Sequence, residues 1–217
     1  MPKPLLLFPF GGTAREALAV ILSSAELSRQ WNVLGFVDDR KEAKEKECCG
    51  VKVLGSRDVI TEFSDAYVLA VPAHPRSHLK RPEIIDSLGL EPGRFAQIIH
   101  PSSVIAQDAK VGYNTFIAPH CFISTKTVIG NHCVILSNTV VSHDSQIQDY
   151  CCLGANVTIS GTVSIGLGAY IGSAASIKEN ILIGEKSLVG IGANVIHPVE
   201  AKTVVIGNPA RFLKENI

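Results

Sequence analysis

The sequence of 217 residues lacks an excess of either charge and lacks long apolar runs. Its 20 basic and 20 acidic residues cancel, and neither sign forms a long block, so no footprint for nucleic acid or an anionic membrane is present. The run Leu5–Phe8 is shorter than a signal-peptide core, and no stretch approaches the roughly 20 apolar residues of a bilayer span. These absences predict a soluble, cytoplasmic protein with neither a membrane nor a nucleic-acid partner.

The sequence also lacks Cys-x-x-Cys pairs, although it contains six cysteines. Two adjacent pairs occur, Cys48-Cys49 and Cys151-Cys152, and there is no secretory segment to suggest an oxidising compartment. We therefore expect reduced thiols rather than a disulfide framework.

The chain changes character near residue 100, which predicts one domain over residues 1–100 and another over 101–217. In the first part, short β-type runs alternate with helical spacing, a pattern typical of a small, Rossmann-like parallel sheet. The expected strands are Leu5–Phe10, Val33–Val37, Val51–Leu54, Tyr67–Val71 and Phe95–Ile99, and the expected helices are Ala14–Arg29 and His78–Leu88. The mixed-sign stretch Arg40–Glu47 favours a solvated loop, and we assign it no function.

The second part repeats every six residues. All sixteen positions at this spacing from Ile105 to Val195 hold Ile, Val or Leu. Two residues before them, thirteen of the sixteen positions hold Ala, Ser, Thr or Cys. This period fits short parallel strands that wind around a triangular prism with about 18 residues per coil. The pattern therefore predicts a parallel β-helix.

The register assigns structural roles to residues that could otherwise suggest chemistry. Cys121, Cys133 and Cys151 fall on the small inward position, where a thiol behaves as a compact apolar group. His120 and His132 are twelve residues apart and so lie on different faces, which argues against a shared metal ion within one chain. Glycines often follow the aliphatic position, where we expect the backbone to turn. The glycines in question are Gly112, Gly130, Gly154, Gly166, Gly172, Gly184 and Gly190.

The hexapeptide pattern, the preceding α/β domain and the closing segment Ile206–Arg211 together resemble the hexapeptide-repeat acyltransferases. Within that family the chain is similar to the sialic-acid O-acetyltransferase (NeuD-type) group, which includes bacterial enzymes that N-acetylate nucleotide-activated amino sugars. The resemblance implies a left-handed β-helix, acetyl-CoA as co-substrate and no metal. It also implies a homotrimer with the acetyl-CoA groove between neighbouring helices.

The segment Asn138–Asp144 resembles the family motif in which a histidine and a following acidic residue form the catalytic pair. The resemblance makes His143 the general base and Asp144 the group that orients its ring and stabilises the imidazolium. Gly161 lies 18 residues further on, so it should stack one coil above His143, and its N–H could stabilise an oxyanion. Asn138 is expected among the substrate contacts.

By resemblance, the acetyl-CoA contacts fall on Cys152, Ser173 and Ile191. Cys152 departs from the family, because many relatives carry a second histidine nine residues after the catalytic one. An acetyl-cysteine intermediate at Cys152 is an alternative to direct transfer, although the relatives transfer the acetyl group directly.

In the first domain, the turn Pro9–Glu16 resembles the family's glycine-rich turn before the first helix, where backbone N–H groups can meet a phosphate. Asp38 and Asp39 follow the second strand and could accept hydrogen bonds from ribose or base. Pro9 and Pro72 stand where relatives commonly have glycine, and Thr13 replaces a frequent histidine. The expected substrate-binding residues are Gly11, Gly12, Thr13, Asp38, Asp39, Pro72 and Asn138.

Together with the family resemblance, these features predict N-acetylation of a nucleotide-linked 4-amino-4,6-dideoxysugar. Three alternatives stay open: O-acetylation of sialic acid or another sugar hydroxyl, a γ-carbonic-anhydrase-like metal protein, and a non-catalytic scaffold. The sequence does not identify the sugar or the nucleotide.

Overall fold

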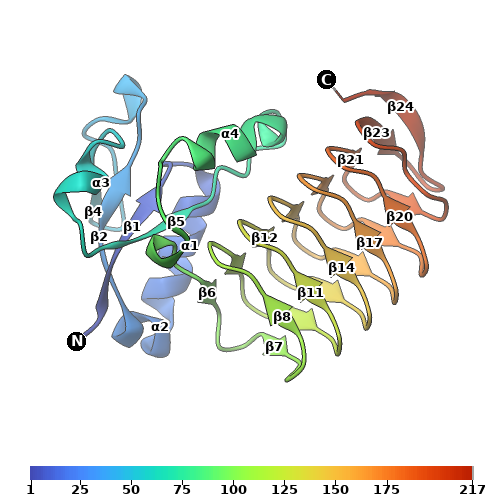
Figure 1. Cartoon of the computed structure of the whole chain (residues 1–217), viewed down its shortest axis with the longest axis horizontal. Coiled ribbons are helices and arrows are strands. Elements are labelled where there is room, and N and C mark those ends of the chain that lie inside the picture. Colours follow the sequence, from blue (N-terminus) through green and yellow to red (C-terminus); the bar gives the residue numbers. More distant parts are fainter. Residues whose placement is uncertain (217) are drawn as a thin grey trace.

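A computed structural model describes residues 1–216 as an α/β unit followed by a three-sided parallel β-helix (Figure 1). The α/β unit contains one sheet in the order β3-β4-β2-β1-β5, parallel except for the β3–β4 pair. Its strands are β1 (Lys3–Phe8), β2 (Trp31–Val37), β3 (Glu47–Cys48), β4 (Val51–Gly55) and β5 (Tyr67–Ala70). Its helices are α1 (Gly12–Ser23), α2 (Ala25–Gln30), α3 (Val59–Glu62) and α4 (Arg81–Asp86), with short 3-10 turns η1 (Lys41–Ala43), η2 (His78–Lys80) and η3 (Pro92–Arg94).

Two elements of this unit differ from the sequence-based expectation. The segment Ala14–Arg29 forms two helices because the chain breaks at Ser24, whose hydroxyl accepts a hydrogen bond from the Leu27 N–H at 3.3 Å and so begins α2. The expected strand Phe95–Ile99 does not join this sheet. Only Phe95 bridges to Val68, and the next strand pairs with the β-helix instead.

The β-helix has three faces, and each is named after the strand that it contributes to the first complete coil, β7, β8 or β9. The β7 face contains β7 (Val104–Ile105), β10 (Phe122–Ile123), β13 (Val140–Val141), β16 (Thr158–Ile159), β19 (Ser176–Ile177) and β22 (Asn194–Val195). The β8 face contains β8 (Lys110–Val111), β11 (Val128–Ile129), β14 (Gln146–Ile147), β17 (Ser164–Ile165) and β20 (Leu182–Ile183). The β9 face contains β6 (Ile98–Ile99), β9 (Phe116–Ile117), β12 (Val134–Ile135), β15 (Cys152–Leu153), β18 (Tyr170–Ile171), β21 (Leu188–Val189), β23 (Thr203–Ile206) and β24 (Arg211–Glu215).

The predicted six-residue register is confirmed. Up to β22, strands on each face pair in parallel at an offset of 18 residues, as in Phe122 with Val140. The last two strands of the β9 face differ, because β21 pairs with β23 as Leu188 with Val204 and β24 is antiparallel to β23. The aliphatic positions form the core inside the prism, and Cys121, Cys133 and Cys151 are buried among them. Inward hydroxyl groups are satisfied by carbonyls of the next coil, as when Thr139 Oγ1 donates to Gly154 O at 2.8 Å.

The corners, however, turn at a different position from the one expected. The left-handed residue of each corner lies three positions after the aliphatic residue and is usually not glycine. The glycines that directly follow the aliphatic positions are needed for close stacking instead: a Cβ on Gly172 would lie 2.6 Å from the Ile191 N of the next coil. The non-glycine corner residues are Asn114, His120, Lys126, His132, Asn138, Asp144, Tyr150, Asn156, Thr162, Ala174, Asn180 and Lys186.

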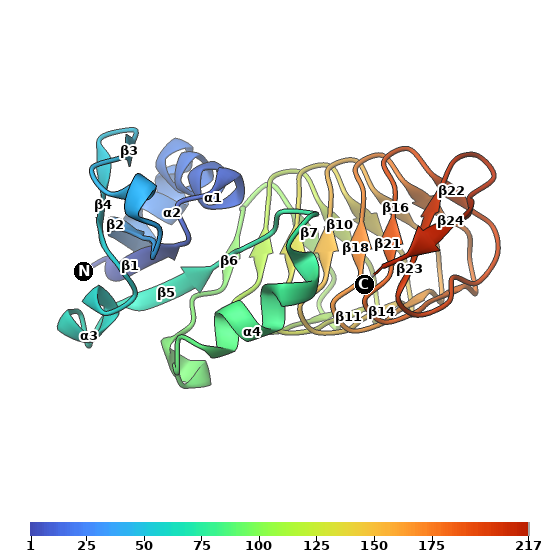
Figure 2. The same cartoon turned by 90° about the horizontal axis from the view of Figure 1, so that it is seen from above.

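The α/β unit packs against the outer side of the β9 face at β9, β12 and β15, beside the first coils of the β-helix (Figure 2). Phe116, Val134 and Cys152 point outward from that face and are buried in one apolar cluster with residues of α1 and β1. Arg81 at the start of α4 is completely buried at the same junction, where it donates hydrogen bonds to the carbonyls of Pro72 and His132. The α/β unit and the β-helix are therefore packed together through apolar and polar contacts. Among the described residues, no helix has the length and apolar character needed to cross a membrane.

Candidate active site and ligand pocket

His143 and Asp144 form a hydrogen-bonded pair at the corner between the β7 and β8 faces. β13 ends at Val141, and the left-handed backbone of Asp144 (φ 59°) turns the chain toward β14. Asp144 Oδ2 lies 2.8 Å from His143 Nδ1. With a neutral ring, Nδ1–H donates to the carboxylate and Nε2 keeps its lone pair. The two side chains are 59% and 46% exposed, so the pair lies at the surface.

Gly161 lies one coil beyond His143, as the register predicts. A Cβ at Gly161 would meet His143 Cε1 at 2.6 Å and Nε2 at 2.7 Å, so the imidazole lies directly against this glycine. Thr162 N donates to His143 O at 2.9 Å and fixes the spacing of the two coils. Within residues 1–216, the Gly161 N–H has no acceptor. The corner thus combines a proton acceptor with a neighbouring unused donor.

The predicted acetyl-CoA contacts Ser173 and Ile191 lie on a different corner, between the β9 and β7 faces. Both side chains are exposed, Ile191 to 81%. Asn138 lies on the same corner, two coils before Ser173. The β7 face separates this corner from His143. One chain therefore does not bring the two sets of residues together.

Cys152 lies on β15 with its side chain turned toward the α/β unit. It is only 3% exposed and packs in the apolar cluster that joins the two parts of the chain. This burial raises the pKa of the Cys152 thiol, which disfavours the thiolate that an acetyl-cysteine intermediate would require. Neither a CoA thioester nor solvent reaches this sulfur within the chain as it stands.

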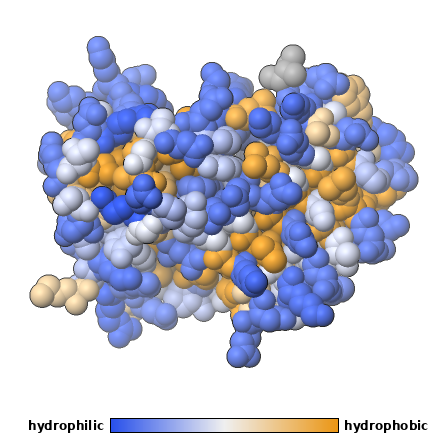
Figure 3. Space-filling view, in the orientation of Figure 1, coloured by the Kyte–Doolittle hydropathy of each residue, from blue (hydrophilic) through white to orange (hydrophobic). Residues whose placement is uncertain are grey.

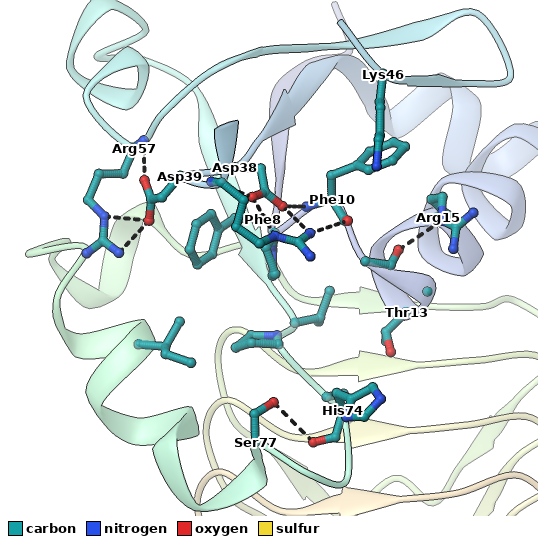
Figure 4. A pocket seen from close by; sticks show the side chains of 18 of the residues that line it. Phe8, Phe10, Thr13, Arg15, Asp38, Asp39, Lys46, Arg57, His74 and Ser77 are labelled. Carbon is teal, nitrogen blue, oxygen red and sulfur yellow. Dashed lines mark hydrogen bonds and ion pairs between the residues drawn. The ribbon is translucent and has the colours of Figure 1, made fainter. Parts of the chain in front are cut away.

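A cavity of about 1030 Å³ opens at the carboxyl ends of β1, β2 and β5 in the α/β unit (Figure 4). Six of the predicted substrate-binding residues line it: Gly11, Gly12, Thr13, Asp38, Asp39 and Pro72. Asn138 does not line it. Ligands of open α/β sheets bind at this edge, where the strands end and the first helix begins.

The glycine-rich turn leaves room for a ligand. A Cβ at Gly12 would meet no atom within 4 Å, and this residue has no positive φ, so the fold alone does not demand glycine there. The N–H groups of Gly12 and Thr13 at the start of α1 have no acceptor within residues 1–216. Free N–H groups at the start of a helix favour an anion. Pro72 contributes its carbonyl to Arg81 rather than to the cavity.

Asp38 and Asp39 are already bound by arginines. Arg40 makes a two-pronged contact with Asp38, from Nε at 2.9 Å and NH2 at 2.7 Å. Arg57 binds Asp39 through its backbone N–H and its side chain, and the side-chain hydrogen bond holds the pKa of Asp39 below its usual value. Arg57 also donates to Ser87, which fixes the cavity edge to the end of α4. We expected both carboxylates to accept hydrogen bonds from ribose or base, whereas the structure gives them arginine partners.

Several cavity residues were not predicted from the sequence. Some of them belong to the charged stretch Arg40–Glu47, to which we assigned no function. Arg40, Lys46 and Glu47 line the cavity. Arg40 follows directly on Asp38-Asp39, and this adjacency is the signal that could have marked it. Other lining residues that sequence alone did not indicate are Arg15, Arg57, His74 and Ser77. Within residues 1–216, no group of three or more His, Cys, Asp or Glu side chains is close enough to hold a metal ion.

Comparison with known proteins supports the architecture. Residues 126–161 match the family model described as bacterial transferase hexapeptide (six repeats). The fold and this repeat define the class of structure as a hexapeptide left-handed β-helix with an N-terminal α/β unit. No curated protein sequence matches the chain.

Three solved structures share the fold over nearly the whole chain. A mutant of perosamine N-acetyltransferase from Caulobacter crescentus, in complex with CoA and GDP-perosamine, has 21% identity and a TM-score of 0.83, covering 99% of this chain and 98% of its own. The acetyltransferase domain of PglB from Neisseria gonorrhoeae, in complex with acetyl coenzyme A, has 20% identity and a TM-score of 0.81, covering 98% and 100%. WeeI from Acinetobacter baumannii has 23% identity and a TM-score of 0.81, also covering 98% and 100%. At these identities the likeness establishes the fold.

Proposed function

We propose that this chain is an acetyl-CoA-dependent N-acetyltransferase that acts on a nucleotide-activated amino sugar of the 4-amino-4,6-dideoxyhexose type. The observation that carries the proposal is the His143–Asp144 pair lying against Gly161, whose N–H is unused. The nucleotide-sized cavity with its glycine-rich turn supports it. The structural neighbours from Caulobacter and Neisseria, crystallised with GDP-perosamine and CoA or with acetyl-CoA, favour the same chemistry.

In the proposed reaction the sugar amine attacks the thioester carbonyl of acetyl-CoA. His143 Nε2 takes the proton that the amine loses, and Asp144 stabilises the imidazolium through Nδ1. Attack moves the C=O π electrons onto the carbonyl oxygen, and the resulting oxyanion accepts a hydrogen bond from the Gly161 N–H. Collapse of this intermediate breaks the carbon–sulfur bond, and the CoA thiolate leaves and is protonated, with His143 as the available proton source.

The chain is expected to act as a homotrimer, because one copy does not unite its own parts of the site. The α/β unit covers the β9 face, whereas His143 lies at the corner between the other two faces, opposite to it. Ser173 and Ile191 lie on yet another corner. Apolar side chains also remain exposed on the β-helix, including Val104 and Phe122 on the β7 face. Figure 3 shows that apolar surface gathers over the β-helix. Association of copies would cover this surface and place His143 of one copy near the cavity of another.

The test is a steady-state assay with acetyl-CoA and a panel of UDP-, GDP- and dTDP-linked 4-amino sugars. We expect one or more to be acetylated, with a product that survives mild base because it is an amide rather than an ester. His143→Ala should lower kcat by about 100-fold or more, the usual contribution of a general base. His197→Ala, which removes another exposed histidine of the β-helix, is the matched control. Full activity in the His143→Ala protein would refute the assigned base.

A further inference from the structure

Three cationic side chains lie around the glycine-rich turn, and each has N–H donors that are not used in hydrogen bonds within the described chain. Arg15 donates from Nε to Gly11 O at 3.3 Å, and its guanidinium lies 5.6 Å from the centroid of the Phe10 ring. Lys46, in the segment between η1 and β3, also lines the cavity, and Arg40 donates hydrogen bonds to both Phe10 O and Asp38. Within the described chain, neither Arg15 nor Lys46 forms an ion pair. These cations line the cavity next to the free N–H groups of Gly12 and Thr13.

Asp38 has no acceptor position left for a ligand. Its Oδ1 accepts from the Arg40 N–H and Nε, both at 2.9 Å, and its Oδ2 accepts from Phe10 N at 2.9 Å and Arg40 NH2 at 2.7 Å. A carboxylate offers about four lone-pair sites, and all four are occupied. The side chain is also only 1% exposed. A ribose hydroxyl could reach it only by displacing Arg40.

The guanidinium of Arg40 is held through Nε and NH2, and its NH1 group is free in the part of the chain that the structure describes. Its NH2 donates to both Phe10 O and Asp38, whereas its NH1 has no acceptor within residues 1–216. The side chain as a whole is 58% exposed. The hydrogen bond that Arg40 donates to Asp38 raises the pKa of Arg40, so the guanidinium remains charged. This geometry is that of a cation aimed into a cavity by a buried carboxylate.

We propose that Arg40, aimed by Asp38 and assisted by Arg15 and Lys46, binds the diphosphate of the ligand, so that the cavity selects for phosphate charge and does not use Asp38 to recognise ribose. This inference rests on the proposed function, because it takes the ligand to be nucleotide-linked. Asp38 is a positioning residue in this scheme. The two N–H donors of Arg40 NH1 remain for phosphate oxygens, and the unused helix N–H groups add to the same anion site.

The experiment is calorimetric titration of the full chain with GDP, dGDP, GMP, UDP and dUDP. The wild-type protein should bind each diphosphate and its 2′-deoxy counterpart within about 3-fold of each other, and GMP about 10-fold or more weakly than GDP, because one phosphate fewer is contacted. Arg40→Gln should weaken diphosphate binding by about 10-fold or more. Arg15→Gln should also weaken diphosphate binding. Its matched control is Arg29→Gln, because Arg29 makes the same local contact, Nε to the carbonyl four residues earlier, on α2 away from the cavity.

A double-mutant cycle separates the two roles of Asp38. If Asp38 acts through Arg40, Asp38→Asn should weaken GDP and dGDP equally, and it should cost little more in the Arg40→Gln background. If Asp38 instead contacts ribose, wild-type binding of GDP would exceed that of dGDP by 10-fold or more, and Asp38→Asn would remove this difference. That second result overturns the inference, as does a failure of every diphosphate to bind. If the diphosphates bind as described but no amino sugar is acetylated, the proposed function is refuted and the inference about the cavity stands.

Discussion

At Gly161 two neighbouring coils approach so closely that a side chain there would collide with the imidazole of His143. We predict that Gly161→Ala lowers kcat by about 10-fold or more, because the new Cβ would lie 2.6 Å from His143 Cε1 and displace the ring from the Gly161 N–H. The obstructed atoms belong to an exposed side chain that can rotate away, so the melting temperature should change little. Acetylation kinetics and thermal unfolding of the same variant check both statements.

Gly93→Ala provides the control for this substitution. Gly93 lies in η3, has no positive φ, and a Cβ there would meet nothing within 4 Å. It should leave both kcat and melting temperature close to the wild-type values. A Gly161→Ala protein with unchanged kcat would show that the ring does not need its observed position.

Residues differ in how far sequence alone can define their surroundings. The position of Gly161 against His143 follows from a separation of 18 residues, because every coil repeats the last. The saturation of Asp38 does not follow from any repeat, since it depends on how the side chain of Arg40 folds back onto the preceding strand end. In a regular solenoid, sequence spacing therefore predicts which residues are neighbours. In a loop at a sheet edge it does not.

Among the structural elements, the junction between the α/β unit and the β-helix contains a buried titratable group. His132 stacks on Tyr150 with ring centroids 4.6 Å apart, and Asn114 Nδ2 lies 2.8 Å from its Nδ1. That amide must donate to Nδ1, so the ring is held in its neutral form. Burial, followed by the nearby charge of Arg81, lowers the pKa of His132 to about 4.

This lowered pKa makes the junction sensitive to acid. Unfolded His132 has an ordinary pKa of 6.5, so the unfolded chain binds more protons between pH 6.5 and 4, and stability is present above that window and lost as pH falls through it. We predict that the free energy of unfolding falls by about 2 kcal/mol from this group between pH 7.5 and 5. Urea titrations at the two pH values measure this change.

His132→Asn is the informative comparison, because asparagine tolerates the left-handed corner conformation (φ 58°) and does not titrate. Asn already occupies the equivalent corner position at Asn114 and Asn138. The variant should be less stable at pH 7.5 through loss of the aromatic stack, yet its stability should vary less with pH. An unchanged pH dependence would mean that His132 is not the group responsible.

The junction also shows that the pattern of strands and helices in the sequence predicts the separate units but not the burial between them. The alternation of strands and helices predicts the α/β sheet, and the six-residue register predicts all three faces of the β-helix. The pattern does not reveal that outward residues such as Phe116 and Cys152 are buried by the first unit, because the same position is exposed on the other faces. Burial of this kind arises from the docking of two units that are each regular by themselves.

For the whole molecule, the separation of the cavity from His143 leads us to expect an active site that is shared between copies. We predict that two inactive chains restore activity when they are co-expressed and co-purified with different tags. One chain carries His143→Ala and keeps its cavity. The other chain keeps its histidine and carries Gly12→Asp. This substitution fills the open space at the glycine-rich turn with a charge that repels phosphate. With random mixing, about one quarter of the sites would join an intact cavity to an intact histidine from a different copy.

Each variant purified alone should be inactive, and light scattering should show a trimer in all preparations. Activity near one quarter of wild type in the mixed preparation would support a site shared between copies. Absence of recovered activity, with mixed trimers demonstrated by the two tags, would place the cavity and the histidine of one chain in the same site and contradict the shared arrangement. An active monomer would do so as well, because it would require the α/β unit to deliver the amino sugar to the corner opposite the face on which it is docked.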